Sequence, residues 1–196
     1  MAIVFYFLLT AALLPSTEAQ TLKPYVAITK HRVHVVSADG KETPSSESFS
    51  ICARDSQGRT IKGPLPSEAS LAVTSGVLID PVARKRYELD GRSRTYREEE
   101  VSASVPSGPP TTSQMYAAAN GTKQVRGISC LTVPAGGPKP GGGMGVIGYN
   151  CLSPDLGGLD LESDLKLEAG GKVLHIIAEI TDLQFVEPPR ELMTIP

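Results

Sequence analysis

The segment LDLESDLKLE, residues 159–168, decides the fold class of this chain. Leucine stands at four of its five odd-numbered positions and Ser163 at the fifth, whereas every even-numbered position carries a charge. Because successive side chains of a β-strand point to opposite faces of a sheet, the alternation predicts an antiparallel strand with one buried and one solvated face. We expect Asp160, Glu162 and Asp164 to share the solvated face, where a row of charges needs no bound cation to account for it.

A hairpin follows this segment directly. Residues 169–172 read AGGK and supply the glycines that a tight turn requires. The next run, residues 173–180 (VLHIIAEI), is apolar at both odd and even positions and also fits one face of a helix. Its β-branched residues and the preceding glycine turn favour a central strand.

Shorter segments repeat the same pattern upstream. Strands are expected at residues 32–37, 48–54, 76–80, 86–89 and 95–105. Turn signals separate them at intervals of about 8–12 residues, which is typical of all-β sheets. A helix is expected only at residues 113–120 (SQMYAAAN), and a mobile Gly/Pro-rich loop at residues 134–145.

These elements predict a mainly β fold with little helix. We expect a single curved antiparallel sheet or half-open barrel, built of successive hairpins. No composition shift divides the chain into two cores, so residues 20–196 are predicted to form one β-rich domain.

Residues 1–19 are predicted to be a signal peptide. The apolar run at residues 3–14 is too short to span a bilayer, which takes about 20 residues. Small residues at Thr17 and Ala19 then precede a cleavage site before Gln20. No second run of spanning length follows, so we expect an exported, periplasmic or extracellular protein that is not an integral membrane protein after cleavage.

Three cysteines bear on the compartment: Cys52, Cys130 and Cys151. In an oxidising environment two of them are expected to pair. Cys130 and Cys151 are nearest in sequence and flank the Gly/Pro-rich loop, which makes them the candidate disulfide across a long hairpin. The alternative is three buried thiols, since free cysteine is among the most buried residue types.

Charge and composition exclude several partners. The chain has 19 Lys+Arg against 21 Asp+Glu, a formal net charge of −2, and aromatics make up 5 % of it with no Trp. This balance gives no field for steering toward nucleic acid. The basic residues between Arg84 and Arg97 are followed at once by three glutamates at 98–100, so we expect ion pairs across neighbouring strands.

No motif in the sequence supports a catalytic, cofactor or metal site. Residues 143–148 match G-x-G-x-x-G, but neither a preceding strand nor a following helix is expected there, so no dinucleotide cofactor is predicted. His31 and His34 are three apart and therefore point to opposite faces of the predicted strand, while His175 is expected to be a hydrogen-bonded structural residue. The sequence also lacks a G-x-S-x-G nucleophile motif. Asn120 begins a glycosylation sequon whose use depends on the source of the protein.

Several turns together carry a resemblance. A group of exported proteins of unknown function common in Acidobacteria is resembled, in order, by residues 53–60 (ARDSQGRT), 77–83 (VLIDPVA), 86–90 (RYELD), 94–97 (RTYR), 132–136 (TVPAG), 153–156 (SPDL) and the proline-bearing end at 186–196. Two features depart from that group: Cys151-Leu152 replaces an aromatic residue, and a Gly-Pro insertion follows Gly136. The repeated hairpins are similar to the lipoprotein-carrier type of fold, which implies a curved, half-closed sheet with an apolar concave face.

Three functions follow as expectations. The first is a non-catalytic module that binds an apolar or cell-envelope ligand, such as a lipid or an envelope protein, because an apolar sheet face needs a cover. The second is a structural or protein-interaction module whose own loops cover that face. A hydrolase with a spatially assembled site, holding His175 beside a Ser and a carboxylate, is the third.

Overall fold

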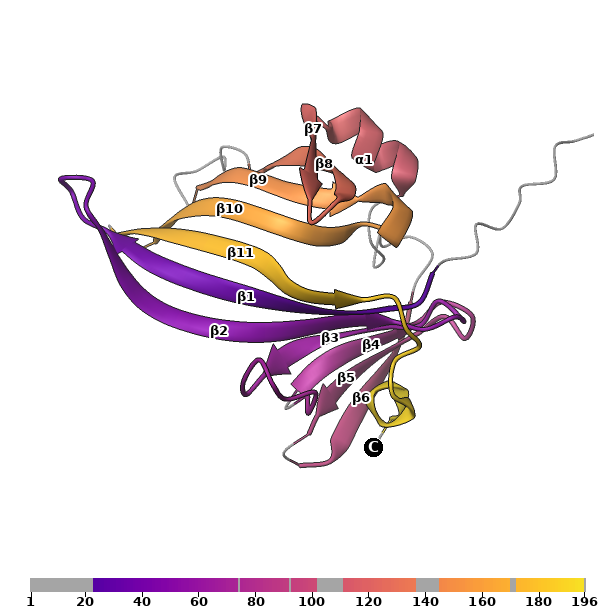
Figure 1. Cartoon of the computed structure of the whole chain (residues 1–196). Coiled ribbons are helices and arrows are strands. Elements are labelled where there is room, and N and C mark those ends of the chain that lie inside the picture. The colour runs from indigo at the N-terminus through magenta and orange to yellow at the C-terminus, as the bar shows by residue number, and fades with distance from the viewer. Residues whose placement is uncertain are drawn as a thin grey trace, which may run out of the picture.

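The computed structural model describes residues 23–73, 75–91, 93–101, 111–136, 145–169 and 172–195. In these ranges the chain forms one antiparallel sheet of eleven strands in the order β6-β5-β4-β3-β2-β1-β11-β10-β9-β8-β7 (Figure 1). The sheet is open, because β6 and β7 at its two ends do not pair with each other. The predicted signal peptide and most of the predicted loop at 134–145 lie outside the described residues.

The sheet consists of two meanders. The first comprises β1 (Tyr25–Val36), β2 (Glu42–Arg54), β3 (Thr60–Leu65), β4 (Ser75–Asp80), β5 (Lys85–Asp90) and β6 (Thr95–Glu100). The second comprises β7 (Gly121–Val125), β8 (Ile128–Ala135), β9 (Val146–Ser153), β10 (Leu159–Ala169) and β11 (Lys172–Gln184). The helical elements are α1 (Thr112–Ala118), η1 (Pro154–Leu156) and η2 (Arg190–Met193).

One long-range pairing joins the two meanders. β1 lies antiparallel to β11 from Val26 opposite Gln184 to Val36 opposite Val173. These two strands and β2 cross the whole molecule, with the remaining strands on either side of them (Figure 1). The run at 173–180 is therefore a central strand with neighbours on both edges, as the sequence predicts.

The predicted fold class is confirmed. The sheet is antiparallel and open, and helix is scarce. The predicted helix at 113–120 is α1, which begins one residue earlier. Thr111 caps it, because its hydroxyl accepts the N–H of Gln114 while the Gln114 side chain accepts the N–H of Thr111.

Strand β3 escaped prediction because its sequence, TIKGPL, contains Gly63 and Pro64. Proline has no N–H to donate and is usually confined to unpaired edges of strands. The structure meets this constraint, since β3 pairs with β4 only through residues 60–62 and Pro64 lies beyond that register. The predicted strand at 95–105 is shorter than expected: β6 ends at Glu100, and residues 102–105 lie outside the described part of the chain.

Two hydrophobic clusters stabilise the sheet. One forms around β1 to β5 and is covered by Leu192 and Met193 of η2, where the C-terminal segment turns back onto the first meander (Figure 1). The other joins Tyr25 and Ala27 of β1 to the β8–β10 region. Each meander therefore contributes to a core that also contains β1.

A disulfide between Cys130 and Cys151 links β8 to β9, as predicted. Both cysteines are buried in the second cluster, and their Cα atoms are 5.3 Å apart. Cys52 is a buried free thiol.

We expect thiol counting on denatured, non-reduced protein to find one free thiol per chain, that of Cys52. Replacing Cys130 and Cys151 together with serine should lower the free energy of unfolding by about 3 kcal/mol, because the bond closes a loop of 21 residues. Urea denaturation measures this change, with Cys52→Ser as the control that leaves the loop closed. A count of three thiols would contradict the pairing.

Candidate functional site

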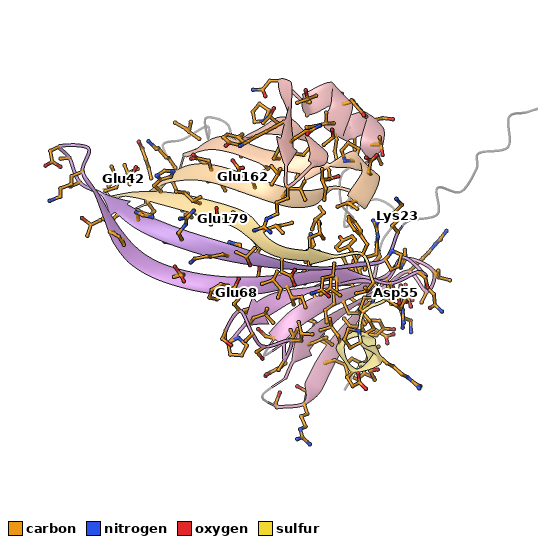
Figure 2. The ribbon with its side chains drawn as sticks, viewed as in Figure 1. Lys23, Glu42, Asp55, Glu68, Glu162 and Glu179 are labelled. Atoms are coloured by element: carbon orange, nitrogen blue, oxygen red, sulfur yellow. A yellow bond between two sulfur atoms is a disulfide. The ribbon has the colours of Figure 1, made fainter. Side chains whose placement is uncertain are left out.

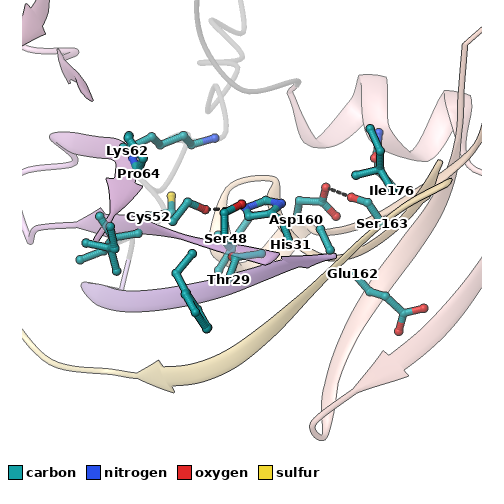
Figure 3. A pocket seen from close by; sticks show the side chains of 18 of the residues that line it. Thr29, His31, Ser48, Cys52, Lys62, Pro64, Asp160, Glu162, Ser163 and Ile176 are labelled. Carbon is teal, nitrogen blue, oxygen red and sulfur yellow. Dashed lines mark hydrogen bonds between the residues drawn. The ribbon is translucent and has the colours of Figure 1, made fainter. Parts of the chain in front are cut away.

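A groove of about 670 Å³ lies on one face of the sheet (Figure 3). Lys62 and Pro64 of β3 line one wall, and Asn150 of β9 lines the other. Strands β2, β1, β11 and β10 lie between β3 and β9 in the sheet. The sheet must therefore curve around this cavity, which we call the concave groove.

Two cross-strand rows of apolar side chains lie on the sheet face that carries this groove, and Ile176 and Leu165 of the first row line it. In the first row, Ile176 of β11, a groove-lining residue, stands opposite Val33 of β1 and Leu165 of β10. In the second, Leu174 stands opposite Val35 and Leu167. Residues directly opposite each other share a face of the sheet, so all six lie on one side. All six are only half-buried among the described residues.

The other face of the same strands is charged. There the two ring nitrogens of His175 lie 2.9 Å from Glu42 Oε1 and 2.8 Å from Asp164 Oδ1, and Arg32 pairs with Glu179 at 3.1 Å. Glu42 lies at the far end of the long strands from Asp55 (Figure 2). The sheet is thus amphipathic along its longest strands, with charged groups on one face and an apolar surface on the groove face.

Asp160 departs from the prediction made for its strand. Asp160 and Glu162 pair with adjacent residues of β9, so Leu161 between them has no partner across that ladder. Such a bulge reverses which face the following side chains take. Asp160 accordingly lies in the groove with Ser163, while the Glu162 carboxylate points away from it (Figure 3). The expectation that Asp160 shares a solvated face with Glu162 and Asp164 is wrong.

The pKa of the Asp160 carboxyl is raised in the groove. Burial raises the pKa of Asp160 from 3.8 to about 6, against the opposing effects of a hydrogen bond from the Ser163 hydroxyl and of the Lys62 charge. Lys62 is exposed on β3 and lies close enough to Asp160 to act on it across the groove. The concave groove therefore has a mixed lining, in which aliphatic side chains lie beside polar ones, with an acid on β10 and a base on β3.

His31 and Ser50 form the other polar pair in the groove. His31 Nε2 lies 2.8 Å from Ser50 Oγ, and burial lowers the pKa of His31. None of the described carboxylates contacts the His31 ring, so the pair lacks the group that orients a catalytic histidine. Cys52, which also lines the groove, is a thiol whose pKa is raised by burial, which disfavours the reactive thiolate.

The other two histidines considered from the sequence, His34 and His175, lie on the charged face and not in the groove. His34 lies on the charged face with its ring 6.2 Å from that of His175, so His31 and His34 do point to opposite faces. His175 contacts two carboxylates, and no described Ser hydroxyl bonds to it. The arrangement expected of a hydrolase centred on His175 is not assembled in the described residues.

Part of the basic stretch forms ion pairs across strands, as predicted. Lys85 pairs with Glu98, and Arg86 pairs with Glu99 at 3.0 Å, across β5 and β6. Arg84, in the turn before β5, instead lines a second cavity. Of the G-x-G-x-x-G match, Gly143 lies outside the described residues, and residues 146–148 belong to β9.

The described part of the chain contains neither a metal-binding cluster nor a membrane-spanning helix. No group of three or more His, Cys, Asp or Glu residues there is arranged to hold a metal ion. None of the helices in those ranges has the length and apolar character needed to span a bilayer.

Comparisons with known proteins add a distant likeness. No family model and no curated protein sequence matches the chain. Among solved structures, a LolA superfamily protein from Nitrosomonas europaea is similar with a TM-score of 0.37 and 9 % identity over 88 % of this chain and 90 % of that one. A domain assigned to outer membrane lipoprotein sorting in Vibrio parahaemolyticus gives a TM-score of 0.31 and 8 % identity over 86 % of each chain. Because both TM-scores lie below 0.5, neither likeness bears on what this chain binds.

The raised pKa of Asp160 predicts a specific pH dependence of stability. The folded protein keeps this proton up to about pH 6, whereas the unfolded chain releases it near pH 3.8, so the free energy of unfolding falls as pH rises between these values. The loss amounts to at most about 3 kcal/mol. Asp160→Asn mimics the protonated acid and should escape this loss, so its stability relative to wild type should increase from pH 4 to pH 7.

Urea denaturation at four pH values across this window measures the difference. Asp155→Asn, which removes an exposed carboxylate of η1, is the matched control and should run parallel to wild type. A constant difference between Asp160→Asn and wild type at every pH would show that Asp160 is ionised throughout.

Proposed function

We propose that this protein is an exported, non-catalytic binding protein that holds an apolar, acyl-chain ligand in the concave groove. One observation carries the proposal: the two rows of half-buried aliphatic side chains on the groove face, opposite a charged face on the same strands. A half-buried apolar surface gains free energy when a ligand removes it from water, at roughly 25 cal/mol per Å².

The dimensions of the groove suit such a ligand. Small-molecule sites enclose roughly 300–1,000 Å³, are lined mainly by apolar residues and contain few polar groups. The concave groove, at about 670 Å³, falls within that range. Its polar lining residues come from β1, β2, β3, β9 and β10, and the aliphatic rows continue along β1, β10 and β11 on the same face of the sheet.

Export is part of the proposal. A structural disulfide persists in oxidising compartments such as the periplasm and is rare in the cytosol, where thiols are kept reduced. The Cys130–Cys151 bond therefore supports a site of action outside the cytosol, in agreement with the predicted signal peptide.

We expect protein recovered from a periplasm to carry a lipid. Native mass spectrometry should show a mass above that of the polypeptide, and organic extraction should release the ligand. Ile176→Asn places a polar amide in the first apolar row and should reduce the extracted lipid about tenfold.

Ile177→Asn is the matched control, since Ile177 neighbours Ile176 in β11 but stands opposite Asp164 and Arg32 on the charged face. The Ile177→Asn variant should retain its lipid, provided that circular dichroism shows it to be folded to the same degree as Ile176→Asn. A bare polypeptide mass for wild type, with no extractable lipid, would refute ligand binding and favour a protein-interaction module.

A further inference from the structure

A second cavity, of about 550 Å³, adjoins the concave groove. Lys62 and Leu159 line both cavities, so they form the boundary between them. We call this second space the side cavity. Its other walls come from the end of β2, the turn between β4 and β5 and the turn between η1 and β10.

Arg54 is the central residue of the side cavity. Its residue exposure is only 3 %, yet its partners are uncharged. Its Nε and Nη2 donate to the Lys23 carbonyl oxygen, and its Nη1 donates to that of Leu156 at 2.9 Å. The guanidinium carbon lies 4.8 Å from the centre of the Tyr25 ring. No described carboxylate pairs with this buried cation.

Burial of an unpaired cation is costly, and arginine does not relieve the cost by losing its proton. The carbonyl bonds engage one N–H on each of the three guanidinium nitrogens, which leaves one N–H on Nη1 and one on Nη2 for a further acceptor. Gly157 allows this approach, since a Cβ at that position would lie 2.5 Å from Arg54 Nη1. The local chain is thus shaped around the guanidinium.

The remaining charges of the side cavity are mostly positive. Lys62 and Arg84 line it together with Arg54, against a single carboxylate, that of Asp80. Asp80 Oδ1 already accepts the N–H groups of Val82 at 2.9 Å and Ala83 at 2.8 Å, which fixes it to its own turn. Three cations around one enclosed space favour an anion within it.

We propose that the side cavity binds the phosphate-type head group of an anionic amphiphile whose acyl chain lies in the concave groove. This inference rests on the proposed function and adds the chemical class of the head group. Arginine and lysine suit phosphate oxygens because they combine charge with several N–H donors. Lys62, at the boundary of the two cavities, lies where head group and chain would meet.

The test compares two ligands that share one acyl chain: a lysophosphatidylglycerol and the uncharged monoacylglycerol, titrated calorimetrically below their micelle concentrations. Wild type should bind the phosphorylated ligand at least about tenfold more tightly. Arg84→Gln and Lys62→Gln should each reduce that ratio of affinities by about tenfold. Lys41→Gln removes an exposed cation of the β1–β2 turn and should leave the ratio unchanged.

Each other outcome has a distinct meaning. If both ligands bind equally, or if the two variants leave the ratio intact, the head-group site is overturned while the proposed function stands. If neither ligand binds, the proposed function itself fails. Inorganic phosphate is titrated separately: binding as tight as that of the lysolipid would assign the side cavity to a soluble anion and overturn the amphiphile.

Discussion

The pairing of β1 with β11 is the constraint on which the rest of the structure depends. It joins two meanders that otherwise share no strand, and it places the longest strands side by side in the middle of the sheet. The apolar rows exist only because this register sets Val33 against Ile176 and Val35 against Leu174. Shifting the register by one residue would carry the aliphatic side chains of β11 to the charged face and destroy the groove surface.

A second local device shapes the polar end of the groove. The bulge at Leu161 takes Asp160 from the row of Glu162 and Asp164 and places it in the groove, where burial raises its pKa. The same chain segment then turns through η1 and Gly157, which lets the carbonyl oxygen of Leu156 reach the guanidinium of Arg54. The Asp160 end of the groove and one wall of the side cavity are therefore built from β10 and the turn that precedes it.

Much of the fold was predictable because alternation and glycine turns are local signals. The strand at 159–168, its hairpin partner, the short helix and the disulfide all followed from residues close together in sequence. β3 was missed because Gly63 and Pro64 weaken the local strand signal, and only the register with β4 shows how a proline is accommodated there. The site was less predictable from sequence. Strict alternation of side chains along a strand does not account for an inserted residue, and it therefore places Asp160 on the wrong face.

The surroundings of Arg54 were likewise not predictable from local sequence. In sequence it is one cation in an Arg-Asp turn, and nothing local indicates that Leu156, a hundred residues later, supplies a partner for it. Its burial without a carboxylate emerges only when both meanders have closed on each other. The sequence predicts that Arg84 forms an ion pair like the rest of the basic stretch. In the structure, the turn that contains Arg84 places it in the lining of the side cavity instead.

The position of β11 also determines how this chain can mature as it is made. Synthesis proceeds from the N-terminus, so β1 emerges early and β11 last, and the open edge of β1 stays unpaired until nearly the whole chain is available. Contacts of such large sequence separation slow folding. Until that last strand appears, the chain cannot complete the central pairing of its sheet, and the groove that depends on this pairing cannot form.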